Sequence, residues 1–285
     1  MTPPDGDGDA APGAAGDTLL RMTDEVSIDV RRRTQTFETA RCAVLYPAIA
    51  EAAHRVGAAA VGLVDVGCSP GLDLQVDRVG LTYGNGQVLG DPSSPVQLSA
   101  LLRGDRRLPA RAIPDVVARI GIDRDPLDVT DAAVVRRLHA CLAPGQPEQA
   151  ARLDVELALA ATAPPLLLRG DPVELLPEAV ARVPADALAV VTTTWALSQL
   201  PLEQRLRFLH RLDDAAAGRP VAWVSAEGVG VAPAVPTLGD RRASGHSIIG
   251  LALVEQSTLR AEAVGRCWSR GRLLSWLAPA GSPTP

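Results

Sequence analysis

A tight turn follows a strongly apolar run in the sequence VGLVDVGCSPGLDL, from Val61 to Leu74. A short apolar run bounded by glycines is typical of a strand buried on both faces of a parallel sheet. Because ligands bind beyond the carboxyl ends of such strands, the turn predicts a cofactor site. Gly67 and Gly71 carry no side chain, so the backbone can approach a ligand closely. Asp65, at the strand end, can accept hydrogen bonds from an amine.

The spacing of this turn, D-x-G-x-x-x-G, differs from the G-x-G-x-x-G of dinucleotide sites. Cys68 and Ser69 lie inside the turn and belong to the predicted cofactor site, although a small space-filling thiol is the simpler interpretation of Cys68. Glycine alone is weak evidence, because any tight strand-to-helix connection uses it.

Acids also end the next two expected strands, ARIGID at Asp123 and LLLRGD at Asp171. A carboxylate is a charged acceptor with two oxygens, which suits hydroxyl and amino groups of a cofactor. The alternative is that these acids cap the following helices, as Asp171 before PVELLP would. Asp65 and Asp123 are farther apart than the roughly 20 residues usual between such a turn and a ribose acid. The segment from about residue 77 to 107 is therefore an insertion, or the ribose assignment is wrong.

Other side chains at expected strand ends are weaker candidates. Glu227 ends the fifth strand and is a candidate base, with helix capping as the alternative. Glu38 is a second candidate base, and Gln35 would line a substrate cleft if its helix crosses the strand ends; a solvated helix face is the other interpretation. Trp195 would pack against a flat ligand or in the core.

Two kinds of chemistry lack the residues they need. The histidines share no ligand spacing, so we expect no metal site; they are His54, His139, His210 and His246. The GCSPG stretch lacks the G-x-S-x-G spacing of an acyl-transfer nucleophile.

Strand-like and helix-like segments alternate along the chain, which predicts an α/β fold with a doubly wound, mostly parallel, Rossmann-like sheet. We expect a disordered tail over residues 1–17, a helical segment over 18–57 and the sheet domain over 58–285. The GNG sequence at residues 84–86 predicts a hairpin inserted after the first strand-helix unit. Further strands are expected over 116–123, 165–171, 187–197, 219–228, 245–257 and 261–279, and further helices over 130–144, 147–162 and 202–218.

The composition excludes several partner classes. The chain has 285 residues and a formal net charge of -5, and all 28 of its basic residues are arginine. Aromatic residues make up 3%, so we expect no nucleic-acid partner. The absence of a long apolar run or a signal-like N-terminus predicts no membrane partner and a cytoplasmic location. The oligomeric state stays open.

Several stretches together resemble one family. They are RRRTQTFETAR (31–41), VDVGCSPGLDLQVDR (64–78), PSSPVQL (92–98), ARIGIDRDPLDVTD (118–131), RLDVELALAATAPPLLLRGD (152–171) and VAWVSAEG (221–228). Over residues 31–277 the chain resembles DUF2332, an uncharacterised actinobacterial family. This resemblance implies a fold like that of class I S-adenosylmethionine-dependent methyltransferases.

The turn itself resembles motif I of these methyltransferases. The resemblance implies that the turn contacts the amino-acid half of S-adenosylmethionine, that Asp123 accepts from the ribose hydroxyls and that Asp171 accepts from the adenine amino group. The chain departs from the family in a shorter helical region ahead of the R-x-T-Q-T motif. Phe37 also stands where the family tends to have asparagine, and Arg270 where it favours a His-Gly pair. The departures imply altered or lost catalysis.

The sequence therefore supports two main hypotheses. The first is a methyltransferase that binds S-adenosylmethionine and acts on an unknown small molecule; such a reaction needs orientation and no protein nucleophile. The second is a non-catalytic relative that binds a ligand or a protein. A nicotinamide-dependent oxidoreductase is the weakest alternative, because G-x-G-x-x-G is missing.

Overall fold

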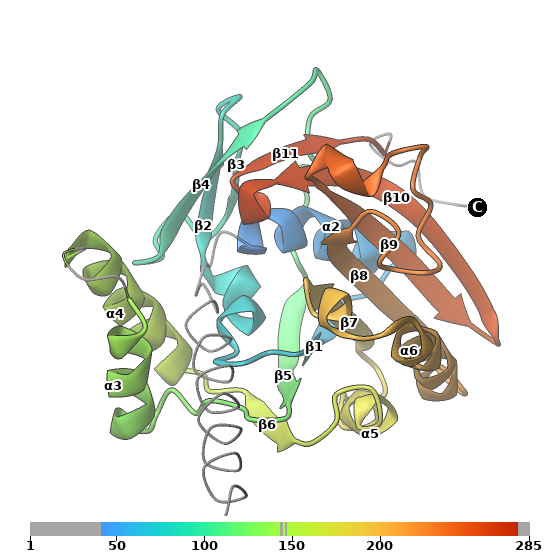
Figure 1. Ribbon diagram of the computed structural model, residues 1–285, viewed down its shortest axis with the longest axis horizontal. Coiled ribbons are helices and arrows are strands. Elements are labelled where there is room, and N and C mark those ends of the chain that lie inside the picture. Colours follow the sequence, from blue (N-terminus) through green and yellow to red (C-terminus); the bar gives the residue numbers. More distant parts are fainter. Residues whose placement is uncertain (1–40, 143–144, 146, 279–285) are drawn as a thin grey trace, which may run out of the picture. The chain divides into compact units, whose positions relative to one another are not determined.

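The computed structural model describes residues 41–142, 145 and 147–278. Within them, one mixed sheet of 11 strands has the order β3-β2-β4-β11-β10-β9-β8-β7-β1-β5-β6 (Figure 1). The strands are β1 (Ala60–Val66), β2 (Gly80–Tyr83), β3 (Val88–Gly90), β4 (Gln97–Leu102), β5 (Asp115–Asp123), β6 (Leu166–Arg169), β7 (Leu188–Thr194), β8 (Val221–Gly228), β9 (Ser247–Glu255), β10 (Thr258–Trp268) and β11 (Leu273–Trp276). The α-helices are α2 (Cys42–Arg55), α3 (Ala132–Ala140), α4 (Pro147–Ala161), α5 (Leu176–Ala181) and α6 (Leu202–Ala215). The short 3-10 helices are η2 (Leu72–Arg78), η3 (Leu197–Gln199), η4 (Arg242–Ser244) and η5 (Ser269–Gly271).

Five parallel strands form the expected doubly wound part. They lie in the order β6-β5-β1-β7-β8. Counted along the chain, this order is 3-2-1-4-5, the arrangement in which ligands bind where the strand order reverses. The reversal lies between β1 and β7, and we call the edge at which these five strands end the carboxyl edge.

The other half of the sheet differs from an ordinary doubly wound fold. Strands β9, β10 and β11 each run antiparallel to the preceding strand in the sheet. The predicted hairpin across residues 84–86 is confirmed as β2 and β3. The sequence did not predict β4, which pairs in parallel with both β2 and β11 and joins the insertion to the far end of the sheet. Six of the ten strand pairings are parallel, so the sheet is mostly parallel, as expected.

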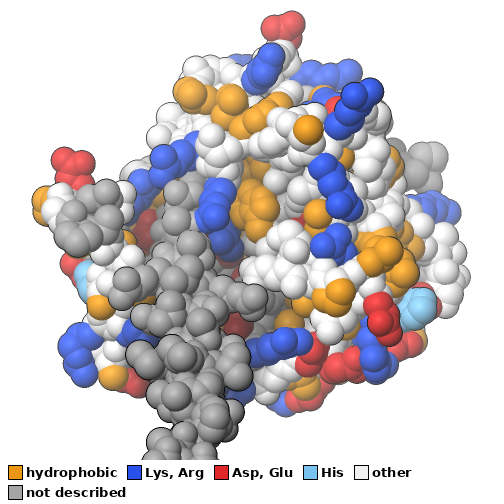
Figure 2. Space-filling view, in the orientation of Figure 1, with side chains coloured by type: hydrophobic (Ala, Val, Ile, Leu, Met, Phe, Trp, Pro, Cys, Tyr) orange, Lys and Arg blue, Asp and Glu red, His pale blue; other side chains and the backbone are white. Residues whose placement is uncertain are grey.

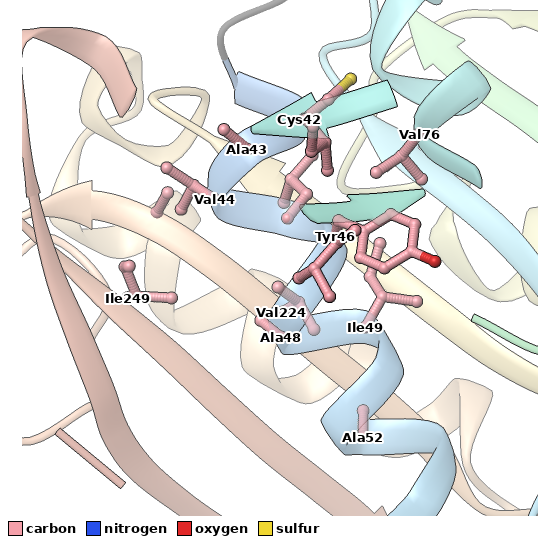
Figure 3. Close-up of a cluster of buried hydrophobic side chains, with 14 of the residues drawn as sticks. Cys42, Ala43, Val44, Tyr46, Ala48, Ile49, Ala52, Val76, Val224 and Ile249 are labelled. Carbon is pink, nitrogen blue, oxygen red and sulfur yellow. The ribbon is translucent and has the colours of Figure 1, made fainter. Parts of the chain in front are cut away.

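Helix α2 is enclosed by the sheet. Its sequence, CAVLYPAIAEAAHR, is apolar on all sides, and its first 12 residues are buried, as expected for a helix that has protein all around it. Figure 1 shows β4, β11, β10 and β9 arching over it. Figure 3 shows Val224 of β8 and Ile249 of β9 beside Val44 and Ala48 of this helix. The last part of the expected 18–57 segment is thus in the core of the sheet domain.

A proline inside α2 is compensated by a tyrosine from the insertion. Pro47 lacks an N–H, so the carbonyl of Ala43, four residues earlier, loses its helical donor. The hydroxyl of Tyr83, in β2, donates to this carbonyl at 2.8 Å. The insertion therefore completes the hydrogen bonding of the core helix.

Helices α5 and α6 cover the opposite face of the parallel strands. Successive residues of β1 point to opposite faces of the sheet. Leu63 packs in the core cluster that contains α2, and Val64 packs in the cluster that contains α5 and α6. The ring of Phe208 in α6 packs on Trp223 of β8 with centroids 5.1 Å apart. Helices therefore pack against both faces of the parallel strands.

Candidate functional site

Asp65 lies at the reversal of strand order. It is opposite Thr192 of β7 in the strand ladder, and the Thr192 hydroxyl donates to its Oδ1 at 2.7 Å. The residue is 2% exposed. Burial and the nearby Asp73 raise the pKa of Asp65 to about 8, although Thr192 and Arg41 act in the opposite direction. This carboxyl is therefore protonated at neutral pH unless a cation joins it.

Asp73 is a second buried carboxyl beside the first. It lies in the first turn of η2, and its Oδ2 is 3.4 Å from both Arg41 Nη1 and Thr194 Oγ1. Burial raises the pKa of Asp73, and Arg41 and Thr194 partly offset that rise. Within the described residues, Arg41 is the cation that acts on both carboxyls. The site thus holds two buried acids against one guanidinium.

The glycine turn keeps its shape through its own N–H groups. Gly67 and Cys68 donate to Ile122 O (2.8 and 3.2 Å), Ser69 donates to Asp123 Oδ2 (2.9 Å), and Gly71 donates to Cys68 O (2.9 Å). Gly67 and Gly71 have φ values of 76° and 70°, in the left-handed region that favours glycine. A Cβ at Gly67 would lie 3.2 Å from that of Ala196, so the loop after β7 packs closely on the turn.

Cys68 fills space beneath the turn. Its thiol packs over Gly121 of β5, where a Cβ would come 3.1 Å from the Cys68 Cβ. Burial raises the pKa of this thiol, which makes it a poor nucleophile. Cys68 is therefore a space-filling residue, which was the simpler interpretation of its place in the sequence.

Asp123 is beside the turn, although it is far from Asp65 in the sequence. It ends β5, which pairs directly with β1. Its two oxygens accept from the N–H groups of Ser69 and Asp125, both at 2.9 Å. Each oxygen keeps a lone pair for a further donor. The segment between the two acids does form an insertion, which contains β2, β3 and β4, so the long spacing is compatible with one site that includes both acids.

Asp171 follows β6, the third strand, and is one-third exposed. Its Oδ1 accepts from the N–H groups of Val173 (2.9 Å) and Glu174 (3.4 Å), and Arg124 donates to its Oδ2 at 2.7 Å. This geometry is that of the capping alternative. The three predicted acids end neighbouring strands, but Asp171 is two strands away from Asp65.

Trp195 follows β7 in a strained conformation. Its φ is 54°, which is rare for a residue with a Cβ and frequent at functional sites. Its indole N–H donates to the Ser247 hydroxyl at 2.8 Å, and the Arg41 guanidinium lies 5.4 Å from the ring centroid. The half-buried ring therefore faces the site on its Arg41 side and also packs against the core.

Glu227 positions the loop that carries Trp195. The side chain is buried, and its two oxygens accept from the N–H groups of Leu197 (3.0 Å) and Ser198 (3.3 Å). Burial raises its pKa to about 7, and these N–H groups partly offset that rise. Because backbone donors occupy both oxygens, the capping alternative describes this residue better than the general-base hypothesis.

The remaining candidates fall in two groups. Gln35, Phe37 and Glu38 lie outside the described residues, as does the expected tail over 1–17. Arg270, by contrast, lies in η5 with a φ of 54°.

Sequence reasoning missed Asp73 and the contributions of Ser247 and His246. The signal for Asp73 was its place two residues after Gly71, where the next element begins at the carboxyl edge. Ser247 begins β9 and His246 directly precedes it; because this strand is antiparallel to β8, its start lies at the carboxyl edge.

Neither a metal cluster nor a membrane span is found in the part of the chain that the structure describes: no three His, Cys, Asp or Glu side chains converge on one point, and no helix there is both long and apolar enough to cross a bilayer.

Comparison with known protein families identifies the family of the chain. No curated protein matches the chain. A family model described as an uncharacterised protein conserved in bacteria matches residues 2–276. The match covers nearly the whole chain, and the protein belongs to the DUF2332 family.

Proposed function

We propose that the protein binds S-adenosylmethionine at the reversal between β1 and β7 and transfers its methyl group to a small molecule. The observation that carries the proposal is a pair of acids, the buried Asp65 and the largely buried Asp73, which face one guanidinium, that of Arg41, among the residues that the structure describes. If both acids ionise, one negative charge stays uncompensated in a desolvated place, which is costly. A bound cation would balance that charge. S-adenosylmethionine carries an ammonium group at its amino-acid end.

The neighbouring residues fit the rest of such a cofactor. The parallel strands have the 3-2-1-4-5 order of doubly wound nucleotide-binding sheets. In the proposal Asp123, held beside the turn by Ser69, accepts from the ribose hydroxyls, and Asp171 lies one strand further, toward the adenine. Gly67 and Gly71 give the turn its left-handed backbone conformation and let Ala196 and Pro165 pack closely on it. The Trp195 ring, fixed by Ser247, closes the other side.

The chemistry needs little from the protein beyond position. When bound, the sulfonium cofactor supplies the methyl group: the acceptor atom bonds to the methyl carbon as the carbon–sulfur bond breaks, and its electron pair stays on sulfur. The role of Asp65, Asp73 and Asp123 is to orient, and orientation alone can supply much of the acceleration.

A second candidate is a non-catalytic protein that binds the same ligand. It is favoured by Glu227, whose oxygens are both occupied by backbone N–H groups, so the predicted base is not free. The two candidates share the cofactor and differ in turnover.

Calorimetric titration with S-adenosylmethionine, S-adenosylhomocysteine and NADH tests the proposal. We expect both adenosyl compounds to bind. We expect Asp65→Asn to weaken them by roughly 10- to 100-fold, since a hydrogen bond to a charged group contributes about 1.5–3 kcal/mol. Asp213→Asn, an exposed acid on α6, is the matched control and should bind as the wild type does. If neither adenosyl compound binds, or if Asp65→Asn binds them unchanged, the proposal is wrong, and binding of NADH alone would favour an oxidoreductase.

A further inference from the structure

Two tryptophans at the carboxyl edge stand apart from the other aromatic residues. The chain has only 4 Trp, 2 Tyr and 2 Phe. Of those that the structure describes, Tyr46, Tyr83, Phe208, Trp223 and Trp276 are buried in the core. Trp195 and Trp268 are half-buried. In a chain with so few aromatic residues, two rings kept partly open at one edge call for a functional explanation.

The start of β9 brings these two rings together. Because β9 is antiparallel to its neighbours, Ser247 lies opposite Gly228, at the end of β8, and opposite Cys267, next to Trp268. The Trp195 indole donates to the Ser247 hydroxyl at 2.8 Å. The His246 ring packs on Trp268 with centroids 5.3 Å apart. The two indoles therefore flank one dipeptide, His246–Ser247, beside the proposed cofactor site.

An arginine guanidinium lies against each of the two indole rings. The guanidinium of Arg41 lies 5.4 Å from the Trp195 centroid, and that of Arg103 lies 5.9 Å from the Trp268 centroid. An indole ring attracts a guanidinium that lies within about 6 Å of its centroid. Arg41 also donates to Asp73, so Arg103 is the arginine of the two that is available to a planar anion. We call these four residues, Arg41, Trp195, Arg103 and Trp268, the arginine–tryptophan rim.

The charge around Trp268 is positive. Asp240 is already engaged, since it accepts from Arg266 at 2.6 and 3.1 Å and lies 2.9 Å from His246 Nε2. Arg103 has no acidic partner among the residues that the structure describes. Arg270 is exposed on η5, which packs against α2 and follows Trp268 directly. Figure 2 shows arginine side chains recurring over the upper half of the face on which η5 and β11 lie.

This local charge opposes the charge of the whole chain, whose formal net value is -5. An acidic protein repels anions at long range, so a cationic rim at one edge selects for the ligand that carries the matching group. Guanidinium edges suit a carboxylate, and the indole rings suit an apolar body attached to it.

We propose that the arginine–tryptophan rim binds the acceptor, and that the acceptor is a small organic acid whose carboxylate meets Arg103 while its apolar body contacts Trp268. The role of acceptor rests on the proposed function; the binding of the acid does not. His246, fixed by Asp240, acts here as a positioning residue that holds the Trp268 ring in place.

The test uses benzoate as the simplest carboxylate on an apolar ring, benzyl alcohol as its neutral counterpart and phenyl phosphate as the alternative anion. Each is titrated into the full chain while tryptophan fluorescence is recorded, with and without S-adenosylhomocysteine. We expect benzoate to bind at least 10-fold more tightly than benzyl alcohol and no more weakly than phenyl phosphate. Arg103→Ala should lose the preference for benzoate over benzyl alcohol, whereas Arg182→Ala, which replaces an exposed arginine at the C-terminal end of α5, should keep it. Trp268→Phe should remove most of the fluorescence change.

The outcomes separate the two proposals. Equal binding of benzoate and benzyl alcohol, or an unchanged preference in Arg103→Ala, would overturn the acid site. If phenyl phosphate binds more tightly than benzoate, the assignment of a carboxylate ligand is wrong and the ligand is a phosphate ester. If the wild-type protein binds benzoate through Arg103 but does not bind S-adenosylhomocysteine, the acid site stands, whereas the proposed function, and with it the acceptor role, is wrong. Calorimetry of Arg103→Ala with S-adenosylhomocysteine should give the wild-type affinity, because Arg103 is outside the cofactor site.

Discussion

Replacement of Asp65 by asparagine should change the pH dependence of stability. Asparagine has nearly the same shape, and its carbonyl oxygen can still accept from the Thr192 hydroxyl, which donates to Asp65 Oδ1 at 2.7 Å in the wild type. The substitution therefore removes a titrating group and leaves the packing in place. Any difference between the two proteins that varies with pH comes from the carboxyl and from its effect on Asp73.

The sign follows from the raised pKa. The pKa of Asp65 is about 8 in the folded protein, against an ordinary value of 3.8 for an aspartate. Between these values the folded state holds a proton that the unfolded chain has released, so the free energy of unfolding falls as the pH rises. From pH 6 to pH 8, a group with a folded pKa of 8 loses about 2 kcal/mol of stability. The asparagine side chain does not titrate, so the stability of the variant should change less over the same interval.

Guanidinium chloride unfolding of both proteins at pH 6, 7 and 8 measures this difference. The quantity of interest is the unfolding free energy of the variant minus that of the wild type, because the titration of all distant groups cancels in it. We expect this difference to shift in favour of the variant by about 2 kcal/mol between pH 6 and pH 8. Parallel pH profiles for the two proteins would refute the burial argument and, with it, the reasoning that the site needs a cation.

Two further substitutions test the turn and the loop that faces it. Gly71→Ala should destabilise the protein by more than Gly86→Ala, as measured by chemical unfolding: both glycines have a positive φ (70° and 81°), but only at Gly71 would a Cβ meet another group, Pro165 Cγ at 3.0 Å. The left-handed conformation alone should cost about 1–2 kcal/mol at each position, and equal losses would show that the contact has no effect. Glu227→Gln should cost at most about 1 kcal/mol at pH 5, because the wild-type carboxyl is protonated there and, like the amide, offers one carbonyl oxygen to the N–H groups of Leu197 and Ser198. The pKa of Glu227 is raised to about 7, so the unfolding free energy of the wild type falls as the pH rises toward 7, and the stability difference between wild type and variant should shrink. A difference that grows with pH would contradict the raised pKa of Glu227.

The parallel half of the fold was predictable because its signals are local. Strands β1, β7 and β8 are short, largely apolar runs buried on both faces, and a polar residue or a glycine at or next to the end of each marks the carboxyl edge. The hairpin of β2 and β3 was predictable from the glycines that its turn requires. Strand β4 was not, because half of its residues are exposed and its partners β2 and β11 are joined to it only by long-range pairing.

The candidate site was predictable in part for the same reason. Asp65 and Asp123 follow from strand ends, and their neighbours in the sheet follow from the doubly wound order. The pairing of Asp65 with Asp73 depends on the path of the chain after the turn, where η2 replaces the expected helix. Asp171 shows the limit of the rule: the acid is at the expected place, yet its oxygens accept from Val173 and Glu174, as a capping residue does.

The antiparallel strands explain why the carboxyl edge holds more than a doubly wound sheet would place there. In parallel strands only the residues that follow each strand reach this edge. An antiparallel strand begins where its parallel neighbour ends, so β9 brings His246 and Ser247 to the edge with its first residues, and β10 returns there to place Trp268. Strand β4 then pairs with β11, which follows η5, and brings Arg103 beside that ring. The part of the chain that departs from the doubly wound pattern is therefore the part that supplies the second half of the site, and a ligand that touches both halves would join the motifs before residue 130 to those after residue 240.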